Sequence, residues 1–341
     1  MNNVQTSPKI KKETKNKIKV DFERTPLSER LKGKFFSTYF LGRVIWFIFR
    51  LLLLLGLSYI ILFPFFTKIS SSFMSAEDYV DVTVRLIPKY PTLQNYAAII
   101  RDNDYFKAML NTFILSFTCA VIQTFICCLI AYGFAKFKFK GSKILFMLVI
   151  LTMIIPHSTL QLSMFMKFKN FDILGLIQLF TGSASPISFI NSNIPLYMLS
   201  ITGLAFKNGL YIFLLRQFFK GLPNEFEESA YLDGCGTFRT FVQIILPNSV
   251  AMLITVFMFA FSWQWTDNYY TTLFYTTTGP ALLPGVIKVP SSMQNEMMTN
   301  LQQAGILNTA GLMIIIPLVI LYVFMQRYIV QGIERSGITG D

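Results

Sequence analysis

The sequence predicts an all-α integral membrane protein with six membrane-spanning helices, and three observations lead to that class. Hydrophobic residues make up 53% of the 341-residue chain and charged residues only 14%, whereas a soluble domain carries roughly 25% charged residues. The apolar residues gather in runs of about the 20 residues that a bilayer-crossing helix needs. Lys and Arg gather at the ends of those runs, where membrane proteins place them.

The charge-poor runs locate the spans in order along the chain. We expect helices over about residues 44–66, 108–134, 144–167, 195–219, 242–265 and 306–326. A stretch rich in Ser, Gly and Asn, residues 181–193, precedes the fourth span, and we expect it not to cross the membrane. Arg50 lies near the inner end of the first span, where its long side chain can reach the headgroups.

Residues 1–40 form a basic cytoplasmic extension, and the membrane domain follows over residues 41–341. The extension holds most of the eleven Lys and Arg residues that lie between Lys9 and Arg43. We expect it to be disordered or to lie on the membrane surface.

The distribution of basic residues also predicts the orientation of the spans. With a cytoplasmic N-terminus, the inner segments hold 20 of the 30 Lys and Arg residues and the outer segments hold 8. Because inner segments of membrane proteins are enriched in these residues, we expect both termini in the cytoplasm.

Charge and cysteine content exclude other classes. A net charge of +12 could indicate nucleic-acid binding, but the basic residues border apolar runs instead of forming one patch. Cys119, Cys127 and Cys128 lie within one apolar run and Cys235 lies outside it, so we interpret them as small hydrophobic residues rather than a disulfide scaffold. His157 is the single histidine, and we expect no metal site.

The segment Gly221–Pro247 predicts two short helices joined by a glycine turn on the cytoplasmic side. Pro223 suits the first turn of a helix. Three acidic residues follow at the helix end whose dipole favours negative charge: Glu225, Glu227 and Glu228. Gly234 and Gly236 can adopt the left-handed conformation that ends a helix, and Thr237 can then cap the second helix.

This segment resembles the EAA loop of ABC-importer permeases. The family pattern is Glu-Ala-Ala, three residues, Gly, nine residues, Ile, one residue, and Leu-Pro. The chain follows it with Ser at the second position, and the matching residues are Glu228, Ser229, Ala230, Asp233, Gly234, Ile244, Leu246 and Pro247. The Asp-Gly pair, together with Phe213–Phe219 and Ala131–Phe137, is similar to the maltose-type, carbohydrate permeases. The resemblance extends from about residue 44 to the C-terminus.

The resemblance implies a type I importer fold whose six spans form half of a translocation path for sugars, and oligosaccharides are the sugars we expect. It implies that the loop over residues 220–240 docks on a cytoplasmic ATPase, whose closure drives the conformational change. The chain has no phosphate-binding loop of the form G-x-x-x-x-G-K-[ST]. We therefore expect a transport subunit rather than an enzyme. No cofactor is expected on this chain, since ATP and Mg²⁺ would be bound by the partner ATPase.

The implied partners are a second permease subunit, two ATPase subunits, an extracellular sugar-binding protein, the sugar and membrane lipid, with no nucleic acid. The implied location is the plasma (inner) membrane of a bacterium, crossed several times.

Polar residues within the spans are candidates for the substrate path. Lys207 and Asn208 interrupt the fourth span, and a lysine at a helix centre costs about 2.5–3.5 kcal/mol on insertion scales, so it faces a cavity or pairs with a structural partner. His157 follows a proline and either contacts substrate or packs in a kink. Three residues near the outer end of the fifth span either bind sugar or form an interfacial aromatic belt: Trp263, Trp265 and Asp267.

Other functions fit the sequence less well. A permease for an amino acid or phosphate is the closest alternative, although the Asp-Gly form of the motif favours sugar. A membrane enzyme would need paired carboxylates or a nucleophile–histidine set within the spans. A secondary transporter would predict inverted repeats, and the sequence contains none that we can detect.

Overall fold

A computed structural model describes residues 10–13, 19–22, 38–172, 187–276 and 279–337. The chain divides into two compact units, residues 1–67 and residues 68–341, and each is described by itself. Apart from two short strands and an isolated bridge, the described elements are helices.

The first unit contains the strands and most of the first long helix. Strands β1 (Ile10–Glu13) and β2 (Lys19–Phe22) pair antiparallel. The register pairs Ile10 with Phe22 at one end of the two strands and Glu13 with Lys19 at the other. Residues 10–13 and 19–22 of the basic extension therefore form a strand pair instead of the disorder that was one of our two expectations, and a position on the membrane surface stays a prediction. Helix α2 (Thr38–Ser72) covers the predicted first span and exceeds it at both ends.

The second unit begins with two short helices and a long one. These are α3 (Ala76–Val80), α4 (Gln94–Asp102) and α5 (Tyr105–Lys136). Ser75 and Asp78 form a capping box at the start of α3. Helix α5 is continuous and contains the predicted second span.

The third span, predicted over residues 144–167, is not one straight helix. Helix α6 (Ser142–Ile154), the 3-10 turn η1 (His157–Leu160) and helix α7 (Gln161–Lys169) replace it, with a bend of 95°. Pro156 lies at the break and is extended. Because proline lacks an N–H group and disfavours helical backbone in the residue before it, the helix ends at Ile154.

The fourth span, predicted over residues 195–219, is also broken. Helices α9 (Ile194–Ile201) and α10 (Asn208–Gly221) are separated by six residues. Gly203 and Lys207 have left-handed backbone there, with φ of +75° and +70°, which no α-helix can contain. The non-spanning stretch predicted before this span lies outside the described residues up to residue 186.

The fifth span, predicted over residues 242–265, follows a chain of short elements. These are α11 (Glu225–Leu232), α12 (Thr237–Thr240), the π-helix η2 (Phe241–Ile245), α13 (Leu246–Asn248) and α14 (Val250–Trp265). The chain bends by 78° between α13 and α14. Pro247 cannot donate a backbone hydrogen bond to the turn before it, which accounts for the irregular helix at this point.

The remaining elements are α15 (Tyr269–Phe274), the 3-10 turns η3 (Leu283–Val286) and η4 (Ser291–Met293), and α16 (Asn300–Gly337). Helix α16 extends the predicted span of residues 306–326 at both ends. Asp102 accepts hydrogen bonds from Arg101 and from the Ser292 amide. These bonds lower the pKa of the Asp102 carboxyl and tie η4 to α4.

The core of the second unit forms where α5 packs against α9, α10 and α14, and where α14 packs against α16. The largest fully buried side chains include Trp265, Tyr211, Phe219 and Leu215. Among the described residues, three helices are each long and apolar enough to cross a membrane, or up to five if each bent pair counts as one span. Six unbroken helices are therefore not observed.

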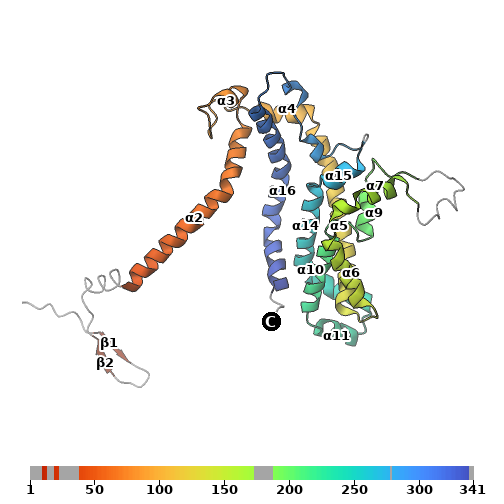
Figure 1. The fold of residues 1–341 in the computed structure, drawn as a ribbon. Coiled ribbons are helices and arrows are strands. Elements are labelled where there is room, and N and C mark those ends of the chain that lie inside the picture. The colour runs from red at the N-terminus through yellow and green to blue at the C-terminus, as the bar shows by residue number, and fades with distance from the viewer. Residues whose placement is uncertain (1–9, 14–18, 23–37, 173–186, 277–278, 338–341) are drawn as a thin grey trace, which may run out of the picture. The chain divides into compact units, whose positions relative to one another are not determined.

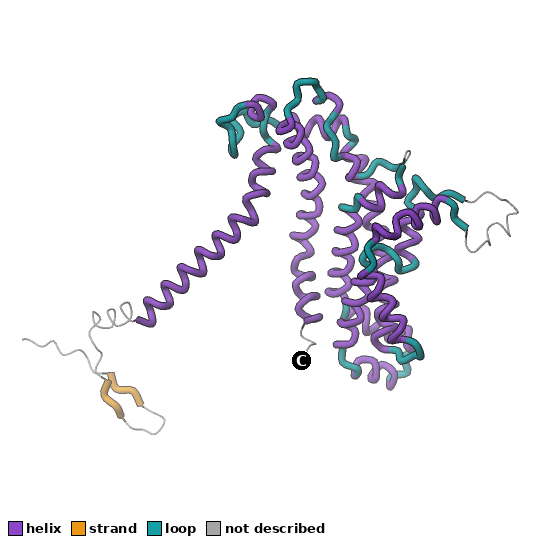
Figure 2. The backbone as a smooth tube through the Cα atoms, viewed as in Figure 1, coloured by secondary structure: helices purple, strands orange, loops and turns teal. Residues whose placement is uncertain are grey.

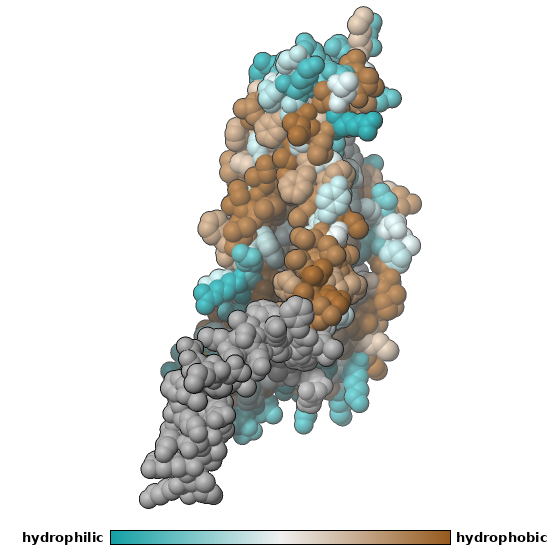
Figure 3. Space-filling view, turned by 90° about the vertical axis from the view of Figure 1, so that its left-hand side faces the viewer, coloured by the Kyte–Doolittle hydropathy of each residue, from teal (hydrophilic) through white to brown (hydrophobic). Residues whose placement is uncertain are grey.

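The helices of this unit give it two distinct ends. Helix α11 and the C-terminal end of α16 lie at one end, while α4 lies at the other (Figure 1, Figure 2). On the face drawn in Figure 3, hydrophobic residues gather in the middle and hydrophilic residues gather toward the top. This distribution is typical of a membrane protein.

Candidate functional site

The loop between α10 and α14 forms the helix–turn–helix that its sequence predicts. Asn224 precedes α11, and its carbonyl oxygen accepts hydrogen bonds from the amides of Glu227 and Glu228. The helix places Glu228 on its exposed side and Glu227 on its buried side. Glu228 is therefore one of the exposed acidic residues at this end of the second unit, together with Glu225 and Asp233.

The turn after α11 requires glycine at one position only. Gly234 has φ of +78°, and its amide donates to the Tyr231 carbonyl while the Cys235 amide donates to the Ala230 carbonyl. This pair of bonds is a Schellman motif, whose central residue is left-handed. Gly236 is extended, with φ of −75° and ψ of 162°. The prediction that Gly236 can share the left-handed role is wrong, because one such residue already turns the chain.

The start of the second helix also differs from the prediction. Gly236 occupies the cap position and Thr237 is already helical, without a capping side-chain bond. The remaining motif residues take different environments: Ser229, Asp233 and Pro247 are exposed, Ile244 and Leu246 are half-buried, and Ala230 is buried. Large apolar side chains lie beside the exposed acidic ones, with Leu232 89% and Phe238 76% exposed. The loop thus presents a mixed apolar and acidic surface.

The buried side of α11 holds an ion pair that the sequence did not indicate. The Lys136 Nζ lies 3.3 Å from the Glu227 Oε2, and the Tyr132 hydroxyl donates to Oε1 at 2.7 Å. We expected Glu227 to lie beside Glu225 and Glu228 at the helix end. The structure instead turns its side chain toward α5, because successive residues on a helix do not share a face.

A second group of predicted residues surrounds a cavity of about 750 Å³ beside the breaks in the third and fourth spans. Its lining includes His157, Lys207 and Phe206. The Lys207 ammonium lies 4.5 Å from the centre of the Phe206 ring and 4.8 Å from that of Trp263. Lys207 forms no ion pair within the part of the chain that the structure describes. The aromatic faces stabilise its charge in place of a carboxylate.

His157 belongs to the same group. Its Nδ1 lies 2.9 Å from the Tyr270 hydroxyl, its carbonyl accepts from the Tyr269 hydroxyl, and its ring contacts Phe206 edge to face. These bonds join the start of η1 to α15. The structure therefore brings His157, Lys207 and Trp263 together, with Phe206 as their common neighbour.

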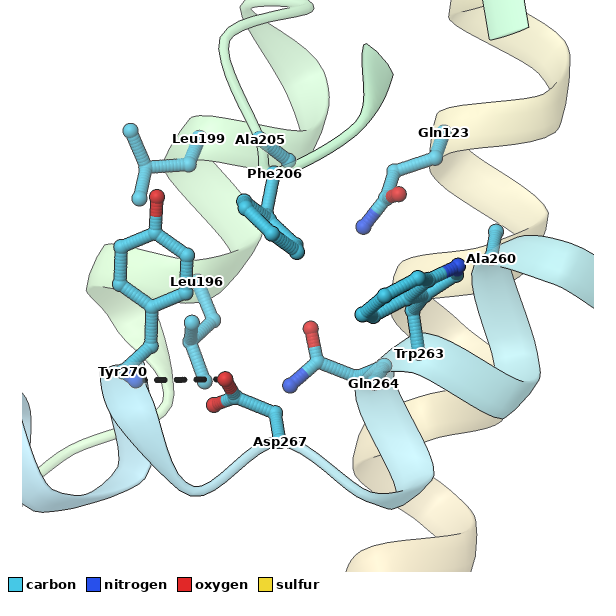
Figure 4. Close-up of a pocket in the computed structure, with 10 residues that line it drawn as sticks. All are labelled: Gln123, Leu196, Leu199, Ala205, Phe206, Ala260, Trp263, Gln264, Asp267 and Tyr270. Atoms are coloured by element: carbon cyan, nitrogen blue, oxygen red, sulfur yellow. Dashed lines mark hydrogen bonds between the residues drawn. The ribbon is translucent and has the colours of Figure 1, made fainter. Parts of the chain in front are cut away.

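A smaller pocket lies next to this group (Figure 4). Gln123 of α5, Gln264 of α14 and Asp267 of the loop after α14 line it, together with Phe206 and Tyr270. Asp267 accepts hydrogen bonds from the amides of Tyr270 and Thr271, so it caps α15. The Nε2 of Gln264 is buried and has no hydrogen-bond partner among the described residues. A polar ligand group or water could satisfy it.

Two predicted path residues have other positions. Trp265 is 2% exposed, and its indole N–H donates to the Ile314 carbonyl at 3.0 Å, so it joins α14 to α16. Asn208 is fully buried at the start of α10. Neither polar atom of its side-chain amide has a partner within the described ranges. No described contact connects either residue to the Lys207 group.

Residues 123–335 match the family described as the binding-protein-dependent transport system inner membrane component. The chain belongs to this family. The matched residues include the loop, the Lys207 group and most of α16, so both groups of residues lie within the matched region. Membership identifies the chain as a membrane transport component, and the family is not one of enzymes.

Relatives agree with this assignment over most of the permease. The chain is 27% identical over 288 residues to the arabinooligosaccharides transport system permease protein AraQ of Bacillus subtilis (strain 168), covering 83% of this chain and 92% of AraQ. It is 27% identical over 302 residues to the galactooligosaccharides transport system permease protein GanQ of the same strain, covering 87% and 97%.

A solved structure has the same fold as this permease. It is a bacterial ABC transporter involved in the import of the acidic polysaccharide alginate. The TM-score is 0.62 at 17% sequence identity, and the match covers 89% of this chain and 99% of that one.

Proposed function

We propose that the chain is a permease subunit of an ATP-driven importer of oligosaccharides, and that α11 is the helix through which a cytoplasmic ATPase drives it. The observation that carries the proposal is the loop geometry. A Schellman turn at Gly234 holds α11 and α12 so that Glu228 and the apolar side chains of Leu232 and Phe238 are exposed. Exposed apolar residues among charges are typical of a docking surface.

Sugar is the substrate class that the relatives favour. AraQ and GanQ are named for arabino- and galactooligosaccharides. The Lys207 group offers what saccharide binding needs, since Trp263 and Phe206 present aromatic faces and neighbouring Gln264 and Asp267 present polar atoms. We propose that this region lies on the sugar path.

The proposed topology has six membrane passes, three of which are interrupted. One of these three is made by α6 and α7, one by α9 and α10, and one by α12 to α14. Both termini and α11 lie in the cytoplasm, and residues 1–40 form the extension before the membrane domain of residues 41–341. The working assembly adds a second permease, two ATPase subunits that bind ATP and Mg²⁺, and an extracellular sugar-binding protein.

The decisive test is capture of the ATPase by permease variants in membranes. Glu228→Lys inverts the exposed charge and is expected to abolish capture and the uptake of labelled arabino- and galactooligosaccharides, because it opposes any basic groove on the ATPase. Glu225→Gln, in the same exposed helix turn, is the control and should retain both. Normal capture and uptake by Glu228→Lys would contradict the proposed role of α11.

A further inference from the structure

We propose that Glu227, Lys136 and Tyr132 form a polar clasp that makes α11 and the end of α5 move as one body. Glu227 is then a positioning residue for coupling, distinct from Glu228, which faces the partner. The inference rests on the proposed function of α11 as the ATPase-facing helix.

The lysine of the clasp has all its donors satisfied by the loop. The Lys136 Nζ lies 3.1 Å from the Leu222 carbonyl oxygen, 2.9 Å from the Asn224 Oδ1 and 3.3 Å from the Glu227 Oε2. An ammonium group has three N–H donors, and three acceptors of the loop match them. Lys136, the last residue of α5, therefore holds both the chain entering α11 and the first turn of α11.

The carboxylate is satisfied as completely. One Glu227 oxygen accepts from the Tyr132 hydroxyl and the other faces Lys136. The side chains of Lys136 and Glu227 are only 8% and 11% exposed. Breaking a buried pair on one side leaves an uncompensated charge, so the two helix ends separate only with difficulty. An ion pair on the surface is broken at little cost, because water solvates the charges that are left.

Tyr132 extends the connection to the second half of the loop. Its ring packs on Phe241 of η2 at 4.7 Å between centroids and meets Phe219 of α10 at 5.7 Å. The end of α5 thus contacts the elements on both sides of the Gly234 turn. Since α5 packs against α9, α10 and α14, a displacement of α11 is passed directly to the helices around the Lys207 cavity.

The test measures conformational coupling without needing the identity of the sugar. Ser163 is exposed and lines the 750 Å³ cavity. A Ser163→Cys reporter is introduced with Cys235→Ser, and the assembled transporter is labelled with a thiol reagent with and without ATP plus vanadate. In the otherwise unaltered chain, nucleotide should change the labelling rate, as ATP-driven rearrangement requires.

Glu227→Gln and Lys136→Met should still capture the ATPase, because Glu228 remains exposed, but should reduce the nucleotide-driven change by about fivefold or more. The double variant should be no worse than either single one, since the two residues act through one contact. Lys136→Arg keeps the cation and should restore most of the response. Glu225→Gln, which leaves the clasp intact because Glu225 takes no part in it, should respond normally.

Three outcomes overturn the inference. The first is an unchanged nucleotide response in Glu227→Gln and Lys136→Met. The second is a double variant whose loss is the sum of the two single losses. The third is loss of assembly in both single variants together with a normal response in the milder Tyr132→Phe, which would reduce the clasp to a structural brace. Failure of the proposed function would give a different result. In that case the reporter chain that carries no substitution in the clasp would itself show no change of labelling with nucleotide.

Discussion

At the residue scale, position 234 requires glycine because of its left-handed backbone conformation and not because space is lacking. No atom lies within 4 Å of a Cβ built at Gly234 or at Gly236, so neither position is sterically crowded. The two differ only in conformation, with φ of +78° at Gly234 and −75° at Gly236. Glycine is therefore required at the first position and replaceable at the second.

Gly234→Val should disrupt the loop while Gly236→Val is tolerated. A β-branched residue in left-handed conformation costs roughly 1–2 kcal/mol, which is enough to redirect α12 without disturbing the membrane helices. The measurement is capture of the ATPase subunit by each variant at matched expression. Equal capture by the two variants would remove the conformational argument for Gly234.

Lys207 and Trp265 both carry a polar group within the membrane domain, but we expect Lys207 to affect sugar uptake and Trp265 to affect stability. Lys207→Ala should raise the sugar concentration for half-maximal uptake, by up to roughly tenfold if about 1–2 kcal/mol of cation–π and polar interaction is lost. Trp265→Phe should instead lower thermal stability, because the Ile314 carbonyl loses its donor. Uptake kinetics and melting in detergent separate the effects. A loss of assembly in Lys207→Ala would make Lys207 structural.

At the scale of elements, α10 approaches α6 closely at Gly209. A Cβ there would lie 2.7 Å from the Thr152 Oγ1 and 2.8 Å from the Met153 Cγ. The approach lets α10 begin directly after the left-handed Lys207 and still pack on α6. The absence of a side chain at Gly209 thus allows α10 to pack closely on α6.

Gly209→Ala should destabilise this packing by about 1–3 kcal/mol, the usual cost of overfilling a packed contact. Gly311→Ala is the matched control, since no atom lies within 4 Å of its Cβ and alanine favours a helix by about 1 kcal/mol. Thermal melting of the purified permease should fall for the first variant and hold or rise for the second. A fall in both would indicate that α16 is crowded at Gly311.

At the scale of the whole molecule, the arrangement of ends agrees with a single inner and a single outer face. Helix α11 and the C-terminal end of α16 share one end of the second unit, and α4 lies at the other (Figure 1). Lys136, the last residue of α5, forms an ion pair with α11. The turn that follows it, over residues 137–141, is basic. The charge distribution predicts that this end is cytoplasmic.

Cysteine labelling in intact cells tests that orientation. In a Cys235→Ser background, Ser291→Cys should react with a membrane-impermeant thiol reagent and Lys140→Cys should not. Both native side chains are exposed, so accessibility does not bias the comparison. Permeabilised cells should label both positions. The opposite pattern in intact cells would invert the proposed topology.

Much of the architecture follows from local properties of the sequence. Long apolar runs predicted α2, α5 and α16 because hydrophobic length alone decides whether a helix can span a bilayer. The turn at Gly234 was predicted because glycine can adopt left-handed backbone without a Cβ clash. A kink at Pro156 was one of the two interpretations of His157, whereas the break after Pro247 was missed, because span prediction weighed hydropathy above backbone hydrogen bonding.

Other features were decided by tertiary structure. Trp263 and Trp265 are two residues apart on α14, yet only Trp265 is covered, because α16 packs on that side. Glu227 and Glu228 are adjacent and chemically identical, yet only Glu227 meets Lys136, 91 residues earlier in the chain. Hydropathy and backbone preference are properties of a short segment, and so the sequence alone determines them. Which of two neighbouring side chains is buried depends on a distant helix, and only the folded chain brings that helix into contact.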